Sequence, residues 1–389
     1  MSRVDSQRIV DLARQLIGIP SMTGSERDVL LKALDLMKSS GLDVSVYGSD
    51  DKPIVVSDVN PGGSPYLVFN GHLDTVPIGD PSAWRRPPFS PCVEDGRLYG
   101  RGASDMKASC AVIMHVMEIL NDTDVGCSVG AQLVPDEEAG GGRGTGVLVK
   151  KMDERLLRRP DGVVIGERSD LKIRVAERGS FRFSIRFRGR STHTAYARLE
   201  GVNAIAKAAK GVMALEKHID KYHQWIGHPV LSVNSVKAGT VMNQVPDECV
   251  IGIDRRLIIG ETADTVVKEV TDALLKAGEG DPDWRWELEA SKDSDGDYVY
   301  TPASFTPPDS RLSMLFHEAV RLVTGRKPEL FVQWAGGTDG KFYRQAGIET
   351  IGMGPVGEHA HGPNEFVSVD SLVAQAKIYL AVAHSFSRT

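Results

Sequence analysis

The feature that most restricts the fold of this sequence is a set of apolar segments that each end in a carboxylate or an imidazole. The clearest segment is the run Val129–Val134, which is followed by the adjacent pair Glu137 and Glu138 and then by three glycines. The run is typical of a buried strand, and the glycines are typical of a turn. Two carboxylates this close repel each other, so the pair indicates a bound cation. A pair of solvated loop glutamates is the alternative.

The same kind of residue follows other apolar segments of the chain: His72, Asp74, Asp105, Glu167 and His361. In an open α/β sheet, ligands bind beyond the carboxyl ends of the strands. Imidazole and carboxylate groups are common ligands of zinc. We therefore expect a metal centre at the carboxyl edge of an α/β sheet.

The chain has 389 residues, which is too many for one ordinary core, so we expect two domains. Up to about residue 178, helical and strand patterns alternate, which predicts a largely parallel sheet with helices on both faces. The expected helices are one within residues 1–20, ended by Gly18 and Pro20, and two at 25–40 and 106–120. The expected strands are 54–58, 66–70, 128–134 and 163–165. The third helix is apolar on nearly all sides and should be buried.

The pattern changes near Arg178, where aromatic and aliphatic residues begin to alternate with arginines over residues 181–188. Period two predicts a strand with one apolar and one basic face. The segments that follow are a helix at 201–221, strands at 230–236 and 249–258, a helix at 262–277 and a strand at 284–290. This β-α-β-β-α-β order predicts a self-contained, ferredoxin-like unit. Nucleic-acid binding by the basic face is disfavoured, because no aromatic residues are interleaved on it.

Residues 291–310 are rich in Asp, Pro and Ser, and they are typical of a linker back to the first domain. A helix at 311–324, a strand at 349–353 and a helix at 369–385 are then expected. We therefore predict one domain built from residues 1–178 and 293–389, with residues 179–292 inserted into it.

Composition excludes several classes of protein. With 46 basic and 52 acidic residues, the net charge of -6 does not favour nucleic acid. The sequence contains no run of eighteen apolar residues, so no membrane span is expected. The amino-terminal segment has the pattern of an amphipathic helix that ends near Gly18, not that of a signal peptide. Four scattered cysteines without a Cys-x-x-Cys pair indicate no disulfide framework, and a reducing cytoplasm is expected.

Taken singly, the motifs admit simpler interpretations. His72 and Asp74 lie two residues apart in an extended segment, so both can point to the same side. His72 would then bind metal while Asp74 accepts its other N–H, although an ordinary loop histidine is the alternative. Asp105 immediately precedes the buried helix and could instead be its N-cap.

Together, five motifs occur in a characteristic order: His72-x-Asp74, Gly100-x-Gly-x-x-Asp-Met-Lys107, Glu137-Glu138, Gly166-Glu167 and His361-Gly-Pro-Asn-Glu365. This series resembles the dinuclear zinc amidohydrolase and metallopeptidase family of acetylornithine deacetylase, succinyl-diaminopimelate desuccinylase, aminoacylase and glutamate carboxypeptidase. The resemblance covers nearly the whole chain. It implies a zinc-peptidase-like catalytic domain and identifies the inserted unit as a lid and dimerisation domain.

The resemblance also implies a role for each motif residue. His72 and Glu167 would hold one metal, Glu138 and His361 would hold the other, and Asp105 would bridge the two. Asp74 would orient His72, and Glu137 would act as general acid and base. Such ligands suit two Zn²⁺ ions per subunit, with Co²⁺ or Mn²⁺ as substitutes. Paired ions activate a shared water, whose proton a neighbouring carboxylate can accept.

Further candidates lie in or near the inserted unit. In the resembled family, the histidine that matches His193 reaches the partner subunit's site and stabilises the oxyanion. Asn243 matches a position that contacts substrate. Arg256 matches an arginine that binds a substrate carboxylate, although a plain surface arginine is the alternative. Gly336, Gly337 and Thr338 match a glycine-rich substrate loop, whose N–H groups can hold an anion.

These inferences predict a cytoplasmic two-zinc hydrolase that cleaves the amide bond of an N-acyl amino acid. An N-acylated diamino acid of arginine or lysine/diaminopimelate biosynthesis is the favoured substrate. A carboxypeptidase or dipeptidase that acts on short peptides is the alternative. A non-catalytic binding protein on the same scaffold would have lost a ligand or Glu137, and none is lost. An exposed edge strand of the inserted unit predicts a homodimer. No nucleic acid or membrane partner is expected.

Overall fold

The computed structural model describes residues 3–293, 295–332 and 336–387. The chain forms two compact units. The first, here called the large unit, comprises Met1–Val175, Phe305–Phe331 and Thr338–Thr389. The second, here called the inserted unit, comprises Ala176–Ser304 and Val332–Gly337. The sequence placed the return to the first domain at residue 293, whereas the compact inserted unit extends to Ser304.

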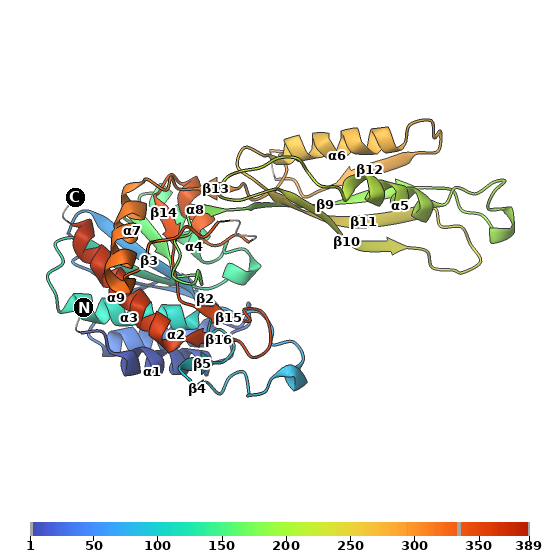
Figure 1. Ribbon diagram of the computed structural model, residues 1–389. Helices are drawn as coiled ribbons and strands as arrows, with labels where there is room; N and C mark the ends of the chain where they lie inside the picture. Colours follow the sequence, from blue (N-terminus) through green and yellow to red (C-terminus); the bar gives the residue numbers. More distant parts are fainter. Residues whose placement is uncertain (1–2, 294, 333–335, 388–389) are drawn as a thin grey trace. The chain divides into compact units, whose positions relative to one another are not determined.

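The large unit is organised around a six-stranded sheet, of which Figure 1 labels β2, β3 and β14. The strand order is β1-β2-β6-β3-β7-β14. The strands are β1 (Val44–Ser49), β2 (Lys52–Val59), β3 (Tyr66–His72), β6 (Ser128–Val134), β7 (Gly162–Ile165) and β14 (Thr350–Gly352). β6, β3, β7 and β14 run parallel, which confirms the predicted mostly parallel sheet. β2 and β1 add an antiparallel edge that the sequence did not predict.

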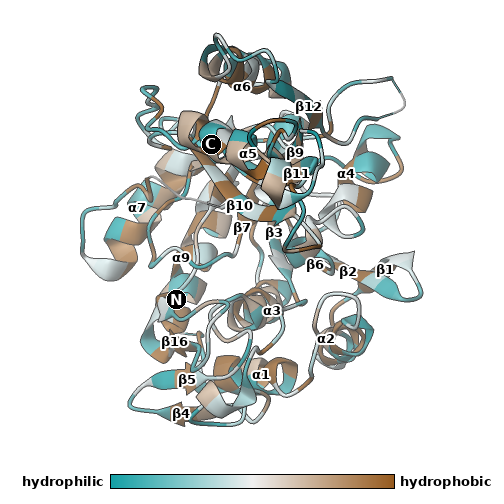
Figure 2. Ribbon diagram, turned by 90° about the vertical axis from the view of Figure 1, so that its right-hand side faces the viewer, coloured by the Kyte–Doolittle hydropathy of each residue, from teal (hydrophilic) through white to brown (hydrophobic). Residues whose placement is uncertain are grey.

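Helices cover both faces of this sheet. They are α1 (Ser6–Ile17), α2 (Arg27–Ser39), α3 (Lys107–Asn121), α4 (Thr145–Asp153), α7 (Arg311–Thr324), α8 (Gly340–Gln345) and α9 (Val369–Phe386). On one face, Leu148 of α4 and Tyr343 of α8 join a buried cluster with Val68 of β3. On the other face, α3 packs between α1 and α9 (Figure 2), and Tyr379 of α9 stacks on Phe69 of β3.

α3 is the most buried helix of those the structure describes. Every residue from Lys107 to Met117 is buried, as its apolar sequence predicts. The single charged group in this stretch, the ammonium of Lys107, donates to the carbonyls of Leu16 and Ile19 at 2.9 and 2.7 Å. The helix therefore ties the end of α1 to the loop that carries Asp105.

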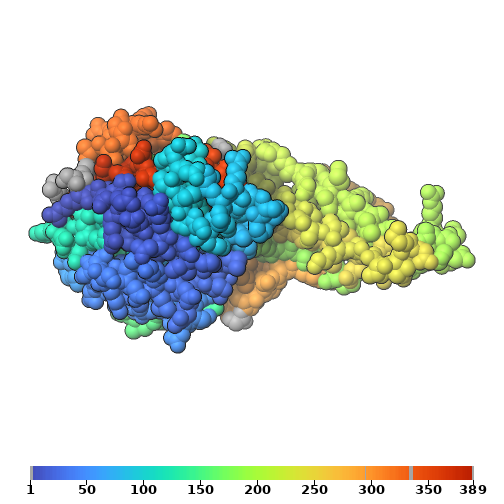
Figure 3. Space-filling view, turned by 90° about the horizontal axis from the view of Figure 1, so that it is seen from below, coloured from blue at the N-terminus to red at the C-terminus, as the bar shows by residue number. Residues whose placement is uncertain are grey.

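A second sheet in the large unit has the order β15-β16-β5-β4. Its strands are β4 (Cys92–Glu94), β5 (Arg97–Tyr99), β15 (Gly357–Glu358) and β16 (Phe366–Ser368). It joins residues 92–99 to residues 357–368, and so it anchors both ends of the loop that contains His361. Figure 3 shows the region of β4, in cyan, at the surface beside the amino-terminal helices in blue.

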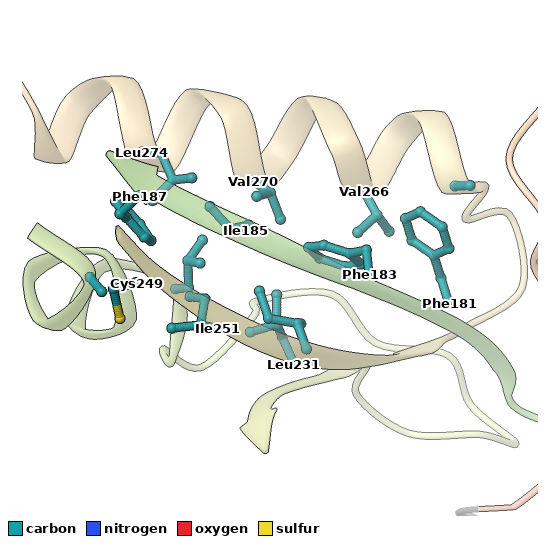
Figure 4. Packing of buried hydrophobic residues seen from close by; sticks show 14 of the residues in the cluster. Phe181, Phe183, Ile185, Phe187, Leu231, Cys249, Ile251, Val266, Val270 and Leu274 are labelled. Atoms are coloured by element: carbon teal, nitrogen blue, oxygen red, sulfur yellow. The ribbon is translucent and has the colours of Figure 1, made fainter. Parts of the chain in front are cut away.

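The inserted unit has the predicted β-α-β-β-α-β order. Its elements are β9 (Gly179–Arg188), α5 (Ala204–Leu215), β10 (Val230–Ala238), β11 (Glu248–Leu257), α6 (Ala263–Ala277) and β12 (Arg285–Glu289). The antiparallel sheet has the order β10-β11-β9-β12. Phe183, Ile185 and Phe187 of β9 pack against Val266 and Val270 of α6 (Figure 4). β8 (Ala176–Glu177) and β13 (Ser304–Phe305) form a short pair where the chain enters and leaves the unit.

The basic face of β9 is neutralised by neighbouring strands. Arg186 pairs with Glu248 of β11 and Glu289 of β12, and Arg188 lies 2.6 Å from Glu248. Cross-strand ion pairs of this kind suit a solvated sheet face. Among the described residues, no helix is long and apolar enough to cross a membrane.

Candidate metal centre

Two groups of potential metal ligands meet in the large unit, and they share Asp105. In the first, Nε2 of His72 lies 3.1 Å from Oδ1 of Asp105 and 3.2 Å from Oε1 of Glu167. In the second, Nε2 of His361 lies 3.0 Å from Oδ2 of Asp105 and 3.1 Å from Oε1 of Glu138. Asp105 thus presents one oxygen to each group, which is the arrangement of a bridging carboxylate.

The sheet explains why these residues meet. His72 is the last residue of β3 and is paired in parallel register with Val134, the last residue of β6. The η2 turn (Glu137–Ala139) follows β6, and Glu167 follows β7 on the other side of β3. The carboxyl ends of three adjacent parallel strands therefore supply three of the side chains. Asp105 does not cap α3: the N-cap position is Met106, and it has no side-chain capping bond.

The residues present fit a pair of divalent cations. Three carboxylates converge with only two imidazoles to offset their charge, and all but His361 are mostly buried. Oε1 of Glu138 is buried within this group, and it faces Nε2 of His361 at 3.1 Å. Carboxylate oxygens and imidazole nitrogens together are ligands that suit Zn²⁺, Co²⁺ or Mn²⁺.

The electrostatics of the site also favour added positive charge. Burial and the nearby charge of Asp105 raise the pKa of the Glu167 carboxyl. Hydrogen bonds to Asp105 and Glu138 raise the pKa of His361 to about 10. Both shifts favour the protonated form of the side chain, and a bound metal ion would supply the same positive charge in place of the proton on the imidazole.

Asp74 contacts both the histidine and the glutamate pair. Nδ1 of His72 lies 2.9 Å from the backbone carbonyl of Asp74 and 3.5 Å from its carboxylate. An acceptor at Nδ1 leaves Nε2 free to bind metal. The carboxylate accepts the backbone N–H groups of Glu137 and Glu138, each at 3.1 Å, and the hydroxyl of Thr23 at 2.8 Å. Asp74 therefore also fixes the turn that carries the two glutamates, a contact that the sequence did not predict.

Glu137 belongs to neither ligand group, although it immediately precedes Glu138 and interacts electrostatically with His72, Glu167 and Asp105. Burial raises the pKa of its carboxyl well above the usual range, and the charges of Glu167, Asp339 and Asp105 raise it further. A carboxylate with a raised pKa accepts a proton more readily at neutral pH, which suits a general base.

Comparison with known proteins places this chain in a family. The model of peptidase family M20/M25/M40 matches residues 68–385. The chain belongs to this family. It is 30% identical over 382 residues to a succinyl-diaminopimelate desuccinylase of Marinobacter nauticus, with 95% of this chain and 96% of the relative covered. The resemblance seen in the sequence is thereby confirmed, and the chain is a metallopeptidase- or amidohydrolase-type enzyme.

Solved structures share the fold. A tripeptidase of Staphylococcus aureus has a TM-score of 0.80 at 20% identity, with 99% of this chain and 100% of that chain covered. A dinuclear metal-binding M20 peptidase of Bacillus subtilis has a TM-score of 0.74 at 18% identity, with 99% of both chains covered.

In this M20 protein, Glu365 organises the loop that carries the shared aspartate. Its carboxylate accepts the backbone N–H groups of Gly102, Ser104 and Asp105 at 2.8–3.0 Å, and Arg101 donates to it at 2.7 Å. Both Glu365 and Arg101 are buried. The sequence displays Glu365 within the His361 motif, but no periodicity indicates that its partners lie more than 250 residues away.

The other candidate residues of this M20 chain are divided between the units. His193, Asn243, Arg256, Gly336 and Gly337 belong to the inserted unit, whereas Thr338 belongs to the large unit. Within the inserted unit, the segments of His193 and Asn243 lie together, since the N–H of Thr194 donates to the carbonyl of Asn243 at 3.0 Å. Both side chains are exposed. Arg256 lies 3.0 Å from Asp254, and Thr338 is buried.

Proposed function

We propose that this M20-family enzyme is a two-zinc hydrolase that cleaves the amide bond of an N-acyl amino acid, in the manner of acetylornithine deacetylase or succinyl-diaminopimelate desuccinylase. The observation that carries this proposal is the sharing of Asp105 between two ligand groups, of which Glu137, the residue before the ligand Glu138, is not a member. The desuccinylase relative, which matches almost the whole chain, supports an N-acylated diamino acid as substrate.

In this proposal, His72 and Glu167 would hold one ion, Glu138 and His361 would hold the other, and Asp105 would contribute one oxygen to each. When bound, the ions supply Lewis-acid polarisation of the scissile carbonyl and a water of lowered pKa. The Glu137 carboxylate accepts the proton of the attacking water and then donates it to the departing amine. Asp74 contacts both the imidazole of His72 and the turn of Glu137, and so it fixes their relative position.

The inserted unit would complete the site. We assign His193 as a donor to the oxyanion in the partner subunit's site. Asn243, Arg256 and the loop of Gly336, Gly337 and Thr338 would bind the substrate and its carboxylate. A homodimer is supported by the position of β10 at a sheet edge, where Val230 and Val236 are exposed apolar residues. All four cysteines are free, in keeping with a cytoplasmic location.

Hydrolysis of short peptides by a carboxypeptidase or dipeptidase activity is the alternative, because the same metal chemistry serves it. A substrate panel separates the two. The chelated protein, with Zn²⁺ or Co²⁺ added back, is assayed on N-succinyl and N-acetyl derivatives of diaminopimelate, ornithine and other amino acids, and on dipeptides and tripeptides. We expect metal-dependent release of the free amino acid from an N-acylated diamino acid. Cleavage of peptides alone would support the alternative, and full activity after exhaustive chelation would refute a metal-dependent hydrolase.

A further inference from the structure

A buried lysine lies outside the metal centre but contacts the segment that carries it. Lys52, the first residue of β2, is 5% exposed, and its ammonium is held between the carboxylates of Glu26 and Asp136, which are 0% and 7% exposed. Its Nζ lies 2.6 Å from Oδ1 of Asp136 and also pairs with Glu26. Removing three charges from water is unfavourable unless the geometry satisfies them closely. Such a buried ion cluster need not stabilise the fold. Its contact with the segment that precedes Glu137 points to a more specific role.

Asp136 is the residue immediately before Glu137, and its backbone is unusual. It has φ +75°, in the left-handed region that residues with a β-carbon rarely adopt. Its carbonyl accepts the N–H groups of Ala139 and Gly141 at 3.2 and 2.7 Å, and this closes the turn. Its second carboxylate oxygen accepts the N–H of Arg143 at 3.0 Å. Both carboxylate oxygens of Asp136 are therefore bonded, one to the ammonium of Lys52 and the other to the N–H of Arg143, which follows the turn.

The opposite side of the turn is held by Asp74, whose carboxylate accepts the N–H groups of Glu137 and Glu138. Residues 23–26 contact both Asp74 and Lys52, and so they connect the two sets of contacts that hold the turn. The hydroxyl of Thr23 donates to Asp74, while Glu26, three residues later, pairs with Lys52. Glu26 also accepts the N–H of Gly24, which fixes this short segment internally.

We infer that Lys52 is a positioning residue for the glutamate pair. It is held by Glu26 and acts through Asp136, and it thereby fixes the turn that orients Glu137 and Glu138. This inference rests on the roles proposed above for those two glutamates. Without the ammonium, two buried carboxylates lose their common partner, and Asp136 loses the contact that holds its side chain. The turn is then free to relax, and small displacements of a reacting group cost large factors in rate.

The test compares Lys52→Met, which removes the charge but keeps most of the length, with Lys52→Arg, which keeps the charge. Arg8→Met is the matched control, because Arg8 also forms an ion pair within the large unit, with Glu118, but does not contact the turn. For each folded protein we would measure kcat, KM and thermal stability. Zinc affinity, measured by competition with a chelator, provides a readout that needs no substrate.

We expect Lys52→Met to lower kcat by roughly 10- to 100-fold with a much smaller change in KM, and to weaken binding of the zinc ion held by Glu138. Lys52→Arg should restore kcat to within a few-fold of wild type, and Arg8→Met should change stability without changing kcat. If Lys52→Met keeps wild-type kcat and zinc affinity, Lys52 only stabilises the fold and the inference is wrong.

If Lys52→Met does not fold, Asp136→Asn decides the matter, because asparagine tolerates the left-handed region but cannot form the ion pair. A wild-type kcat and zinc affinity for Asp136→Asn would overturn the inference. Failure of the proposed function has a different signature: the wild-type protein would hydrolyse no substrate of the panel, while the zinc affinities would still report on the turn.

Discussion

The contact between Glu365 and the loop of Asp105 leads to a quantitative prediction for Glu365→Gln. The wild-type carboxylate accepts three backbone N–H groups and the Arg101 guanidinium, all in a buried site. Glutamine keeps the size, but it replaces one accepting oxygen with an NH₂ group and leaves the buried charge of Arg101 without its partner. Removing one member of a buried ion pair typically costs about 3–5 kcal/mol.

For a domain of this size, about 1 kcal/mol corresponds to a shift in Tm of roughly 2–4 °C, so we expect Tm to fall by roughly 6–20 °C. Because the same N–H groups position Asp105, added zinc should also stabilise the variant less than it stabilises wild type. The assay is thermal unfolding with and without saturating Zn²⁺. Glu358→Gln is the control, since Glu358 lies in the preceding β15 strand but is exposed.

Two outcomes would refute this reasoning. If Glu365→Gln melts within about 2 °C of wild type, the contacts contribute far less than buried pairs normally do. If Glu358→Gln lowers Tm equally, the effect belongs to the segment in general and not to the contacts of Glu365.

Two further predictions concern other parts of the molecule. Burial would raise the pKa of Glu118, but hydrogen bonds from His115, Arg8 and Ser40 lower it to about 2. Its stabilising effect is therefore present above the unfolded-state pKa of about 4.3 and is lost as the pH falls toward 2; Glu118→Gln should destabilise the protein by about 1 kcal/mol at pH 7, and equal urea midpoints for the two proteins at pH 7 would contradict this. Mixing inactive His193→Ala with inactive Glu137→Gln should restore partial activity after subunit exchange, whereas no recovery despite demonstrated exchange would place His193 outside the partner's site.

Much of the large unit could be predicted from its sequence, because the relevant signals are local. α3 is apolar on nearly all sides and is largely buried, and β6 is bounded as its apolar run indicates. Motifs that follow such strands come together because parallel strands present their carboxyl ends at one edge. The strands β4, β5, β15 and β16 were not predicted, since two or three residues are too few to display a period.

The contacts that support the site could not be predicted from the sequence either, because their partners lie far apart along the chain. Lys52 meets Asp136 across 84 residues, and Glu365 meets Gly102 across 263. Several of these partners are backbone N–H groups, which every residue carries and which therefore leave no signal in the sequence. The carboxylate of Asp74 illustrates the point: its pairing with His72 was expected from a spacing of two, but its bonds to Glu137 and Glu138 depend on where β6 ends.

The central claim is that Glu137 acts as general base and Glu138 as metal ligand, and variants of these two adjacent residues test it most directly. The measurement is zinc content per chain together with kcat for wild type, Glu137→Gln and Glu138→Gln. We predict that Glu137→Gln retains the wild-type zinc content while kcat falls by at least roughly 10²–10⁴, and that Glu138→Gln loses zinc. Loss of zinc from Glu137→Gln with full zinc content in Glu138→Gln would show that the two roles are reversed, and unchanged kcat in Glu137→Gln would contradict the account as a whole.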